Sequence, residues 1–138
     1  MKFMVIVKAS KDTEAGVMPG TELLAAMGAF NEEMAKAGVI KAGEGLHPTS
    51  RGARIKYAGD GKAAASKGPF PLSGDLIAGF WLIETKSLDE AIGWMKRAPF
   101  GTGDEIDIRQ VLTADDFGEA LTPELREREA RLRAQAEQ

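Results

Sequence analysis

Two segments of this chain place large apolar residues on both faces of an extended strand, and this feature limits the possible folds more than any other. In segment 3–8 the two alternating sets are Phe3, Val5 and Val7, and Met4 and Ile6. In segment 76–85 they are Ile77, Trp81 and Ile83, and Phe80 and Leu82. Each segment is therefore predicted to be a β-strand that is buried on both sides.

Two further segments have the apolar spacing of amphipathic helices. The first is expected to begin near Thr21, which can cap a helix, and to stop at Gly38. Its apolar stripe consists of Leu23, Met27, Phe30 and Met34. The second begins with Ser87-Leu88-Asp89-Glu90, a pattern in which the serine and the glutamate satisfy each other's free backbone amides. Pro99 is expected to mark its end.

The remaining predicted strands complete an α+β fold. They are expected at 39–46, 53–57 and 105–112, with a turn at 59–61 and a loop at 11–20. The order of elements is the ferredoxin-like βαββαβ pattern with an extra central hairpin. Thr122-Pro123 then starts a C-terminal helix, because a capping residue precedes proline at the first helical position. We therefore expect a main α+β domain over 1–120 and a C-terminal helical arm over 121–138.

The number of helices bears on self-association. Two helices cover only one face of such a sheet, whereas two of its strands are apolar on both faces. A second copy of the chain is the simplest cover for the other face, which predicts a homodimer in the form of a dimeric α/β barrel. A ligand or the C-terminal arm could instead cover part of that face.

The composition excludes several classes of function. The chain has no cysteine, which excludes disulfides, thiolate metal sites and a cysteine nucleophile. A net charge of −3, with acids and bases mixed along the chain, disfavours binding to a nucleic-acid backbone. The apolar run at the N-terminus is too short for a signal sequence or a membrane span. We therefore expect a cytoplasmic protein with no nucleic-acid or membrane partner.

Neither a cofactor nor a metal ion is predicted. The chain has no glycine-rich nucleotide-binding motif. It has a single histidine and scattered carboxylates, and these form no recognisable set of metal ligands. The expected partners are a second copy of the chain and a small-molecule ligand.

Four blocks of sequence, taken together, resemble the YCII-related, DGPF-type proteins. In chain order they are 43–52 (GEGLHPTSRG), 68–70 (GPF), 78–84 (AGFWLIE) and 87–91 (SLDEA). Their order and spacing match across most of the chain, from the first strand to about Leu112, and the closing block 121–124 is similar to longer members. The resemblance implies a dimeric α/β barrel. It implies no established activity, because most such proteins are uncharacterised.

The resemblance is compatible with two different kinds of function. A few more distant YCII-type proteins are lyase-like enzymes that act on ring compounds with a His–Asp pair, whereas some DGPF-type genes neighbour alternative sigma factors. The pair cannot be transferred to this chain, because no histidine occurs near its first helix. The Asp that names the group's motif is Lys67 here, and the acidic tail of the motif is replaced by 71–75. If that Asp was catalytic, the function is absent or changed; if it capped a turn, Ser66 could replace it.

The turn that begins at His47 contains the first candidate site residues. His47 is expected at the end of a strand, where it could act as a general base or could be a loop histidine bonded to backbone. Ser50 and Arg51 could bind a carboxylate or phosphate, or they could form an ordinary hairpin turn. A catalytic His47 would need a carboxylate nearby, for which Asp75 and Glu84 are candidates.

Four more residues are predicted to bind ligand. Phe70 presents a ring that could line a pocket or a dimer contact, or its Gly-Pro-Phe motif could be a stiff entry into the next strand. Trp81 lies on a strand that is apolar on both faces. Glu84, near the end of that strand, is either buried with a partner or exposed at the edge. Arg109 could pair with Glu84 or with a neighbour of Asp107.

These observations support two interpretations from different classes. In the first, the chain is a homodimeric YCII/DGPF-type protein that binds or transforms a small anionic or aromatic metabolite, with His47 as base and Arg51 as anion anchor. In the second, it is a non-enzymatic regulatory or binding module associated with an alternative sigma factor. The loss of the motif Asp favours the second slightly. Both leave open whether the chain is an enzyme.

Overall fold

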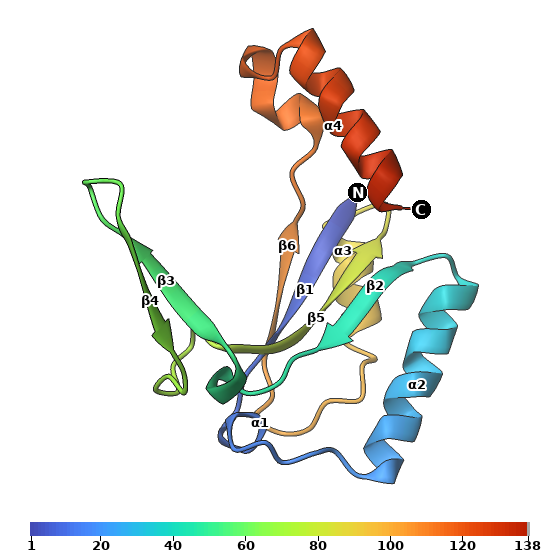
Figure 1. Ribbon diagram of the computed structural model, residues 1–138. Coiled ribbons are helices and arrows are strands. Elements are labelled where there is room, and N and C mark those ends of the chain that lie inside the picture. Colours follow the sequence, from blue (N-terminus) through green and yellow to red (C-terminus); the bar gives the residue numbers. More distant parts are fainter. Residues whose placement is uncertain (138) are drawn as a thin grey trace.

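An antiparallel sheet of four strands forms the centre of the fold, in the order β2-β5-β1-β6 (Figure 1). Its strands are β1 (Lys2–Lys8), β2 (Ile40–Gly45), β5 (Ile77–Glu84) and β6 (Ile106–Gln110). The computed structural model describes residues 1–137. Because β1 and β5 are the two inner strands, the segments that are apolar on both faces lie at the centre of the sheet.

Two helices, α2 (Thr21–Lys36) and α3 (Leu88–Met95), pack on the same face of this sheet. The core combines one alternating set from the inner strands with the apolar stripes of the helices: Phe3, Val5, Phe30, Met34, Trp81, Ile83, Ala91 and Met95 are all buried in it. Burial of these side chains drives the helices onto the sheet. The order of elements confirms the predicted α+β fold, with its ferredoxin-like pattern, central hairpin and C-terminal helix.

The opposite face of the sheet carries the second alternating set of the inner strands. Met4 lies opposite Leu82 in the register of β1 and β5, and Ile6 lies opposite Phe80. All four side chains are only half-buried, whereas their sequence neighbours on the helix side are buried in the core. These four residues form a continuous strip, which we call the apolar strip, and within residues 1–137 no helix buries it.

The central hairpin, β3 (Ala53–Tyr57) and β4 (Ala63–Lys67), forms a separate two-stranded sheet that projects from the rest of the fold (Figure 1). Every residue of both strands is exposed. Ile55 and Tyr57 are 53% and 83% exposed, although the alternating pattern predicts one protected face. A hairpin of two strands has little stability of its own, so its position depends on how its ends are attached.

Two predictions about the segment before α2 are wrong. Segment 11–20 is not all loop, because it contains the single-turn helix α1 (Lys11–Glu14). Ser10 caps this turn: its hydroxyl accepts a hydrogen bond from the Thr13 N–H at 3.2 Å. Thr21 is the first residue of α2 and not its cap, because Gly20 occupies the cap position without a side-chain hydrogen bond.

The start of α3 shows half of the predicted capping box. The Ser87 hydroxyl accepts a hydrogen bond from the Glu90 N–H at 3.1 Å, as expected. The Glu90 carboxylate, however, accepts from the Lys86 N–H at 2.7 Å, one residue before the cap. The helix ends at Met95, earlier than predicted, and the loop that follows brings Phe100 against the core.

The C-terminal segment contains the irregular 3₁₀ helix η2 (Ala114–Ala120) and the helix α4 (Pro123–Ala136). The Thr122 side chain caps α4, and Pro123 occupies its first turn, as predicted. No residue of α4 is buried. The division into a main domain and an arm over 121–138 stays a prediction, and Gln138 lies outside the described residues.

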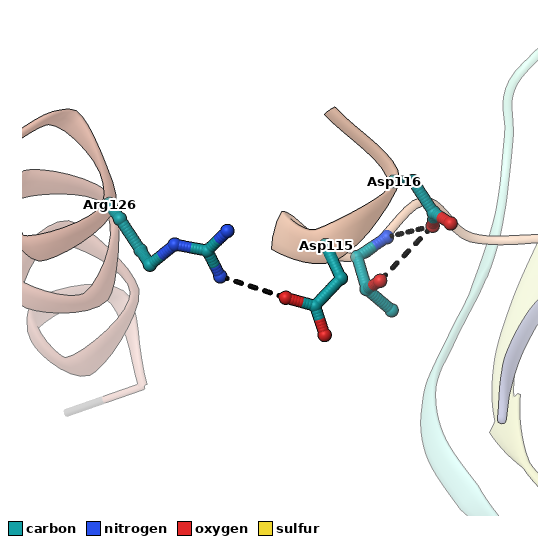
Figure 2. A network of polar contacts seen from close by, with 4 residues as sticks. Asp115, Asp116 and Arg126 are labelled. Atoms are coloured by element: carbon teal, nitrogen blue, oxygen red, sulfur yellow. Dashed lines mark hydrogen bonds and ion pairs between the residues drawn. The ribbon is translucent and has the colours of Figure 1, made fainter. Parts of the chain in front are cut away.

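A small polar network attaches α4 to the segment before it. Figure 2 shows Arg126 of α4 facing Asp115, with Asp116 beside them. Arg126 and Asp115 form an ion pair at 3.0 Å, and Asp116 accepts a hydrogen bond from the Thr113 N–H at 2.7 Å. The Asp115 side chain is 90% exposed, and exposed ion pairs contribute little stability. The position of α4 therefore rests on weak contacts with its own chain.

Candidate functional site

A cleft of about 700 Å³ lies at the end of the sheet where β1 and β2 finish and β5 begins. Its other walls come from α1 with the segment that follows it, from α2 between Leu23 and Asn31, and from Phe100. Figure 1 shows α1 and the start of α2 near the same end of the sheet. Most of the lining is apolar and includes Val7, Met18, Leu23, Met27, Phe80 and Trp81. The polar lining residues are few, namely Asp12, Thr13, Asn31, Glu44 and His47.

The Trp81 indole forms a rigid wall of this cleft. Its side chain is 6% exposed, and its Nε1–H donates a hydrogen bond to Asn31 Oδ1 at 3.0 Å. The rings of Phe30 and Phe100 meet the indole edge to face, with centroids 6.0 and 5.9 Å away. On the neighbouring strand, a Cβ added to Gly43 would lie 2.6 Å from the indole Cδ1. Contacts from two helical neighbours, a loop and a strand therefore fix the ring.

Thr49 connects the cleft wall to the start of the hairpin. It is the first residue of the 3₁₀ helix η1 (Thr49–Arg51). Its hydroxyl donates to Glu14 Oε2 at 2.6 Å, and its N–H donates to Glu14 Oε1 at 3.1 Å. The same hydroxyl accepts from the Phe70 N–H at 2.9 Å. One threonine thus joins α1, η1 and the segment after β4.

The Gly-Pro-Phe motif closes this junction from the hairpin side. The Gly68 N–H donates to the Gly52 carbonyl at 3.0 Å, and the peptide bond that follows Gly68 is cis. A Cβ added to Gly68 would lie 1.8 Å from the Thr49 carbonyl oxygen, so only glycine fits. The Arg54 guanidinium lies over the Phe70 ring, 4.0 Å from its centroid. We call this arrangement the corner; its contacts favour the interpretation of the motif as a stiff structural entry.

Lys67, which replaces the Asp of the motif, lies just before the corner. It is the last residue of β4, it is exposed, and it pairs in register with Ala53. Lys67 is not among the described residues that line the cleft. The change of charge therefore falls on the projecting hairpin.

His47 lies at the rim of the cleft, next to Arg51. Arg51 Nη1 is 3.1 Å from His47 Nε2 and 3.5 Å from Nδ1, and both side chains are exposed. Because the same guanidinium nitrogen is nearly equidistant from both ring nitrogens, it lies over the face of the imidazole ring. The lone pair that a general base would use lies in the ring plane, so Arg51 does not occupy it. Within residues 1–137, no carboxylate forms a hydrogen bond with His47.

The structure separates the other predicted site residues. Glu84 is exposed at the strand end and pairs with Lys41 at 3.5 Å. Arg109 is opposite Met4 on β6, and β1 separates it from β5, so the suggested Glu84–Arg109 pair does not form among the described residues. Glu84, Arg109 and Asp75 are all absent from the described lining of the cleft.

Of the seven predicted site residues, His47 and Trp81 line the cleft. Arg51 adjoins it through His47, and Ser50 and Phe70 belong to the junction behind the rim. Ligand binding or catalysis by any of them stays a prediction. The structure brings two of the four blocks of sequence, 43–52 and 68–70, into contact through the Phe70–Thr49 and Gly68–Gly52 hydrogen bonds.

Sequence reasoning missed Asn31, which lines the cleft and holds Trp81. The sequence pattern around Asn31 could have identified it as a candidate site residue. Met27, Phe30 and Met34 define the buried stripe of α2, and residue 31 falls inside the same stripe because positions four apart share a helix face. A polar side chain in an apolar stripe needs a hydrogen-bond partner, and the Trp81 N–H supplies it.

Away from the cleft, Lys8 links β1 to β6 and to the loop before β5. Its ammonium group lies 2.9 Å from the Asp107 carboxylate and donates to the Gly74 carbonyl at 2.9 Å. The hydrogen bond with Asp107 raises the pKa of Lys8 above its ordinary value of 10.5. Lys8 therefore connects β1 to the edge strand β6 and to the loop before β5.

In the part of the chain that the structure describes, no group of three or more His, Cys, Asp or Glu side chains could hold a metal ion. No helix in that part is long and apolar enough to cross a membrane.

Comparison with known proteins assigns the fold to a family. No curated protein matches the chain. The family model for the YCII-related domain matches residues 1–115, which include the whole sheet, both covering helices and every residue of the cleft lining. This chain therefore belongs to the YCII-related domain family.

Proposed function

We propose that this protein binds a small molecule with an aromatic or otherwise apolar body in the cleft beside Trp81. The observation that carries the proposal is the cleft itself, with a volume of about 700 Å³, apolar walls and few polar groups. Small-molecule sites in proteins have this size and this mixture of surfaces. The fixed indole adds a preformed aromatic surface, which lowers the entropic cost of binding a ring.

Charged residues near the cleft limit the net charge that the ligand can carry. Asp12 and Glu44 line the cleft, and Arg51 stands beside His47 at the rim. Two carboxylates and one guanidinium disfavour a ligand with several negative charges. The ligand therefore carries at most one negative charge, and that charge lies next to Arg51.

The proposal concerns binding first, because no carboxylate among residues 1–137 forms a hydrogen bond with His47, and Arg51 lies over its ring. A carboxylate on the ligand would attract the same guanidinium, since Arg–carboxylate hydrogen bonds are among the strongest in proteins. Catalysis by His47 stays a prediction, and so does the alternative of a regulatory module.

Benzoate and benzamide test the proposal, because they share one ring and differ in charge. We expect both to bind to the wild type, and Arg51→Ala to weaken benzoate about fivefold while benzamide changes by less than about twofold. The dissociation constants come from NMR titrations that follow the indole N–H resonance of Trp81, assigned with Trp94→Phe. Lys56→Ala removes the same charge from the exposed hairpin and should leave both constants unchanged.

Two results would contradict this proposal in different ways. If neither compound shifts the Trp81 resonance up to its solubility limit, the cleft is not a site for small aromatic molecules. If Arg51→Ala weakens benzoate and benzamide equally, the guanidinium does not receive the charge.

We also propose that two copies of the chain pair through the apolar strip. The strip leaves Met4, Ile6, Phe80 and Leu82 half-exposed at the centre of the sheet. A two-fold axis would place the same strip of each copy against the other and cover both at once. The exposed hairpin, with Tyr57 83% accessible, gives each copy a projecting element that can reach its neighbour.

Leu82→Glu is expected to convert this dimer to a monomer, because it places a charge in the middle of the strip without changing the core. Light scattering should give twice 14.8 kDa for the wild type and 14.8 kDa for the variant. Leu24→Glu adds the same charge at a residue of α2 that is 58% exposed, and this control should remain dimeric. A wild-type mass near 14.8 kDa at micromolar concentration would exclude the dimer.

A further inference from the structure

Asn31 occupies an unusual place for a polar residue. It lies on α2 next to the buried Phe30, is itself half-buried, and lines the cleft. Its side-chain oxygen accepts the hydrogen bond from the Trp81 Nε1–H at 3.0 Å. One half of its carboxamide is therefore used to hold the aromatic wall.

The chemistry of the indole fixes which half that is. An indole N–H only donates, so the atom of Asn31 that faces it must be the oxygen Oδ1. The carboxamide is planar, and its NH₂ group must then point away from the indole. Among the described residues, no protein acceptor receives a hydrogen bond from Asn31 Nδ2, and no fully buried side-chain nitrogen or oxygen lacks a partner. The NH₂ group is thus oriented, accessible and free to donate.

A donor with a fixed direction differs from the other polar groups of the cleft. The side chains of Asp12 and Glu44 are exposed carboxylates that only accept, and the Thr13 hydroxyl already donates to the Ser10 carbonyl. The His47 ring is exposed at the rim, with Arg51 over its face. Fixing the orientation of a donor before binding reduces the entropic cost of the hydrogen bond it makes. It also allows a site to reject a ligand that lacks the matching acceptor.

We propose that Asn31 is the specificity-determining residue of the cleft, and that its NH₂ group selects ligands in which a carbonyl or carboxylate oxygen is attached to the apolar body. The inference rests on the proposed function and names the chemical group that the cleft recognises. Trp81 and Asn31 act together in it: the ring contacts the ligand body, and the carboxamide binds its oxygen. A hydrocarbon of the same shape binds without this hydrogen bond.

Acetophenone and ethylbenzene test the role of Asn31, because they have the same ring and similar size but only acetophenone has an acceptor. Both are neutral, so charges at the rim do not affect the comparison. We expect acetophenone to bind the wild type about tenfold more tightly than ethylbenzene, the effect of one hydrogen bond. NMR titrations at the Trp81 indole N–H measure both dissociation constants.

Asn31→Asp is the matching variant. Its carboxylate can still accept from the Trp81 N–H, so the aromatic wall is kept, but it has no NH₂ group to donate. Acetophenone should lose about tenfold in affinity, and ethylbenzene should change by less than about twofold. Ala29→Asp adds the same charge at an exposed position of α2 outside the described lining and should change neither constant.

The outcomes separate this inference from the proposal on which it rests. If acetophenone and ethylbenzene bind the wild type equally, Asn31 does not select a carbonyl group, although the cleft still binds apolar molecules. This comparison needs no variant, so it holds even if Asn31→Asp folds poorly. If neither compound shifts the Trp81 resonance, both the inference and the proposed function are wrong.

Discussion

Gly68→Ala is expected to lower the free energy of unfolding by about 3 kcal/mol, near the upper end for overpacked sites, and the melting temperature by roughly 10 °C. The added Cβ would lie 1.8 Å from the Thr49 carbonyl oxygen and 2.6 Å from the carbonyl carbon. Both are backbone atoms, so no side-chain rotation can relieve the overlap. The corner must open, and the hydrogen bond from the Phe70 N–H to Thr49 is lost with it.

Gly59→Ala is the matched control, because it changes a glycine of the same hairpin where an added Cβ has open space. Its backbone has no left-handed φ angle, so alanine should be tolerated without loss of stability. Thermal and urea unfolding of the two variants and the wild type measure the difference. Equal stability of Gly68→Ala and Gly59→Ala would show that the corner can rearrange at little cost in free energy. Its close contact would then not fix the position of the hairpin.

The corner does not depend on Lys67, which stands where the DGPF-type motif that this chain resembles has Asp. Every contact of the corner uses Gly68, the Phe70 N–H or the Phe70 ring. Lys67 contributes none of them and lies on the exposed hairpin. The structural part of the motif is thus independent of the charge of the residue that precedes it.

The central sheet could be predicted from sequence because its signal is local and strong. In β1 and β5 both alternating sets are apolar, and only an inner strand of a covered sheet requires that pattern. The apolar stripes of α2 and α3 predicted the layer of helices that covers one face of the sheet, because helical spacing is also a local signal. Phe30, Met34, Ala91 and Met95 recur at helical spacing, and all four are buried.

The exposure of both faces of the hairpin, and the first turn, could not be predicted in the same way. Ile55 and Tyr57 alternate with Arg54 and Lys56, which is the pattern of a strand with one protected face, yet both are exposed. Their protection would have to come from outside the chain, and a pattern in one sequence does not show whether a partner supplies it. The α1 turn depends on Ser10 and its local hydrogen bonds, which are hard to distinguish from those of a loop.

Part of the candidate site could be predicted from the sequence. The block that contains His47 and the strand that contains Trp81 are distinctive, and both lead to residues that line the cleft. Asn31 and Gly43 each lie against Trp81, one from α2 and one from β2. The apolar stripe of α2 marks Asn31 as unusual, but its pairing with Trp81 depends on helix placement and strand register, which no local pattern reveals.

Gly43→Ala is expected to destabilise the protein by roughly 2–3 kcal/mol and to displace the Trp81 indole. The added Cβ would lie 2.6 Å from the indole Cδ1 and 3.1 Å from Nε1. The ring cannot yield at low cost, because Phe30 and Phe100 pack against it and Asn31 holds its N–H. Displacement breaks that hydrogen bond and disturbs the cleft wall that the ring forms.

Gly45→Ala provides a strict comparison, since Gly45 is on the same strand, two residues further, and an added Cβ there meets nothing within 4 Å. In a Trp94→Phe background, the fluorescence of Trp81 should shift to longer wavelength in Gly43→Ala and stay unchanged in Gly45→Ala, because only the first exposes the ring. Urea unfolding of the same proteins gives the free-energy difference. An unshifted emission together with wild-type stability in Gly43→Ala would mean that the indole is mobile, and a mobile ring could neither form a preformed wall nor hold Asn31 in one orientation.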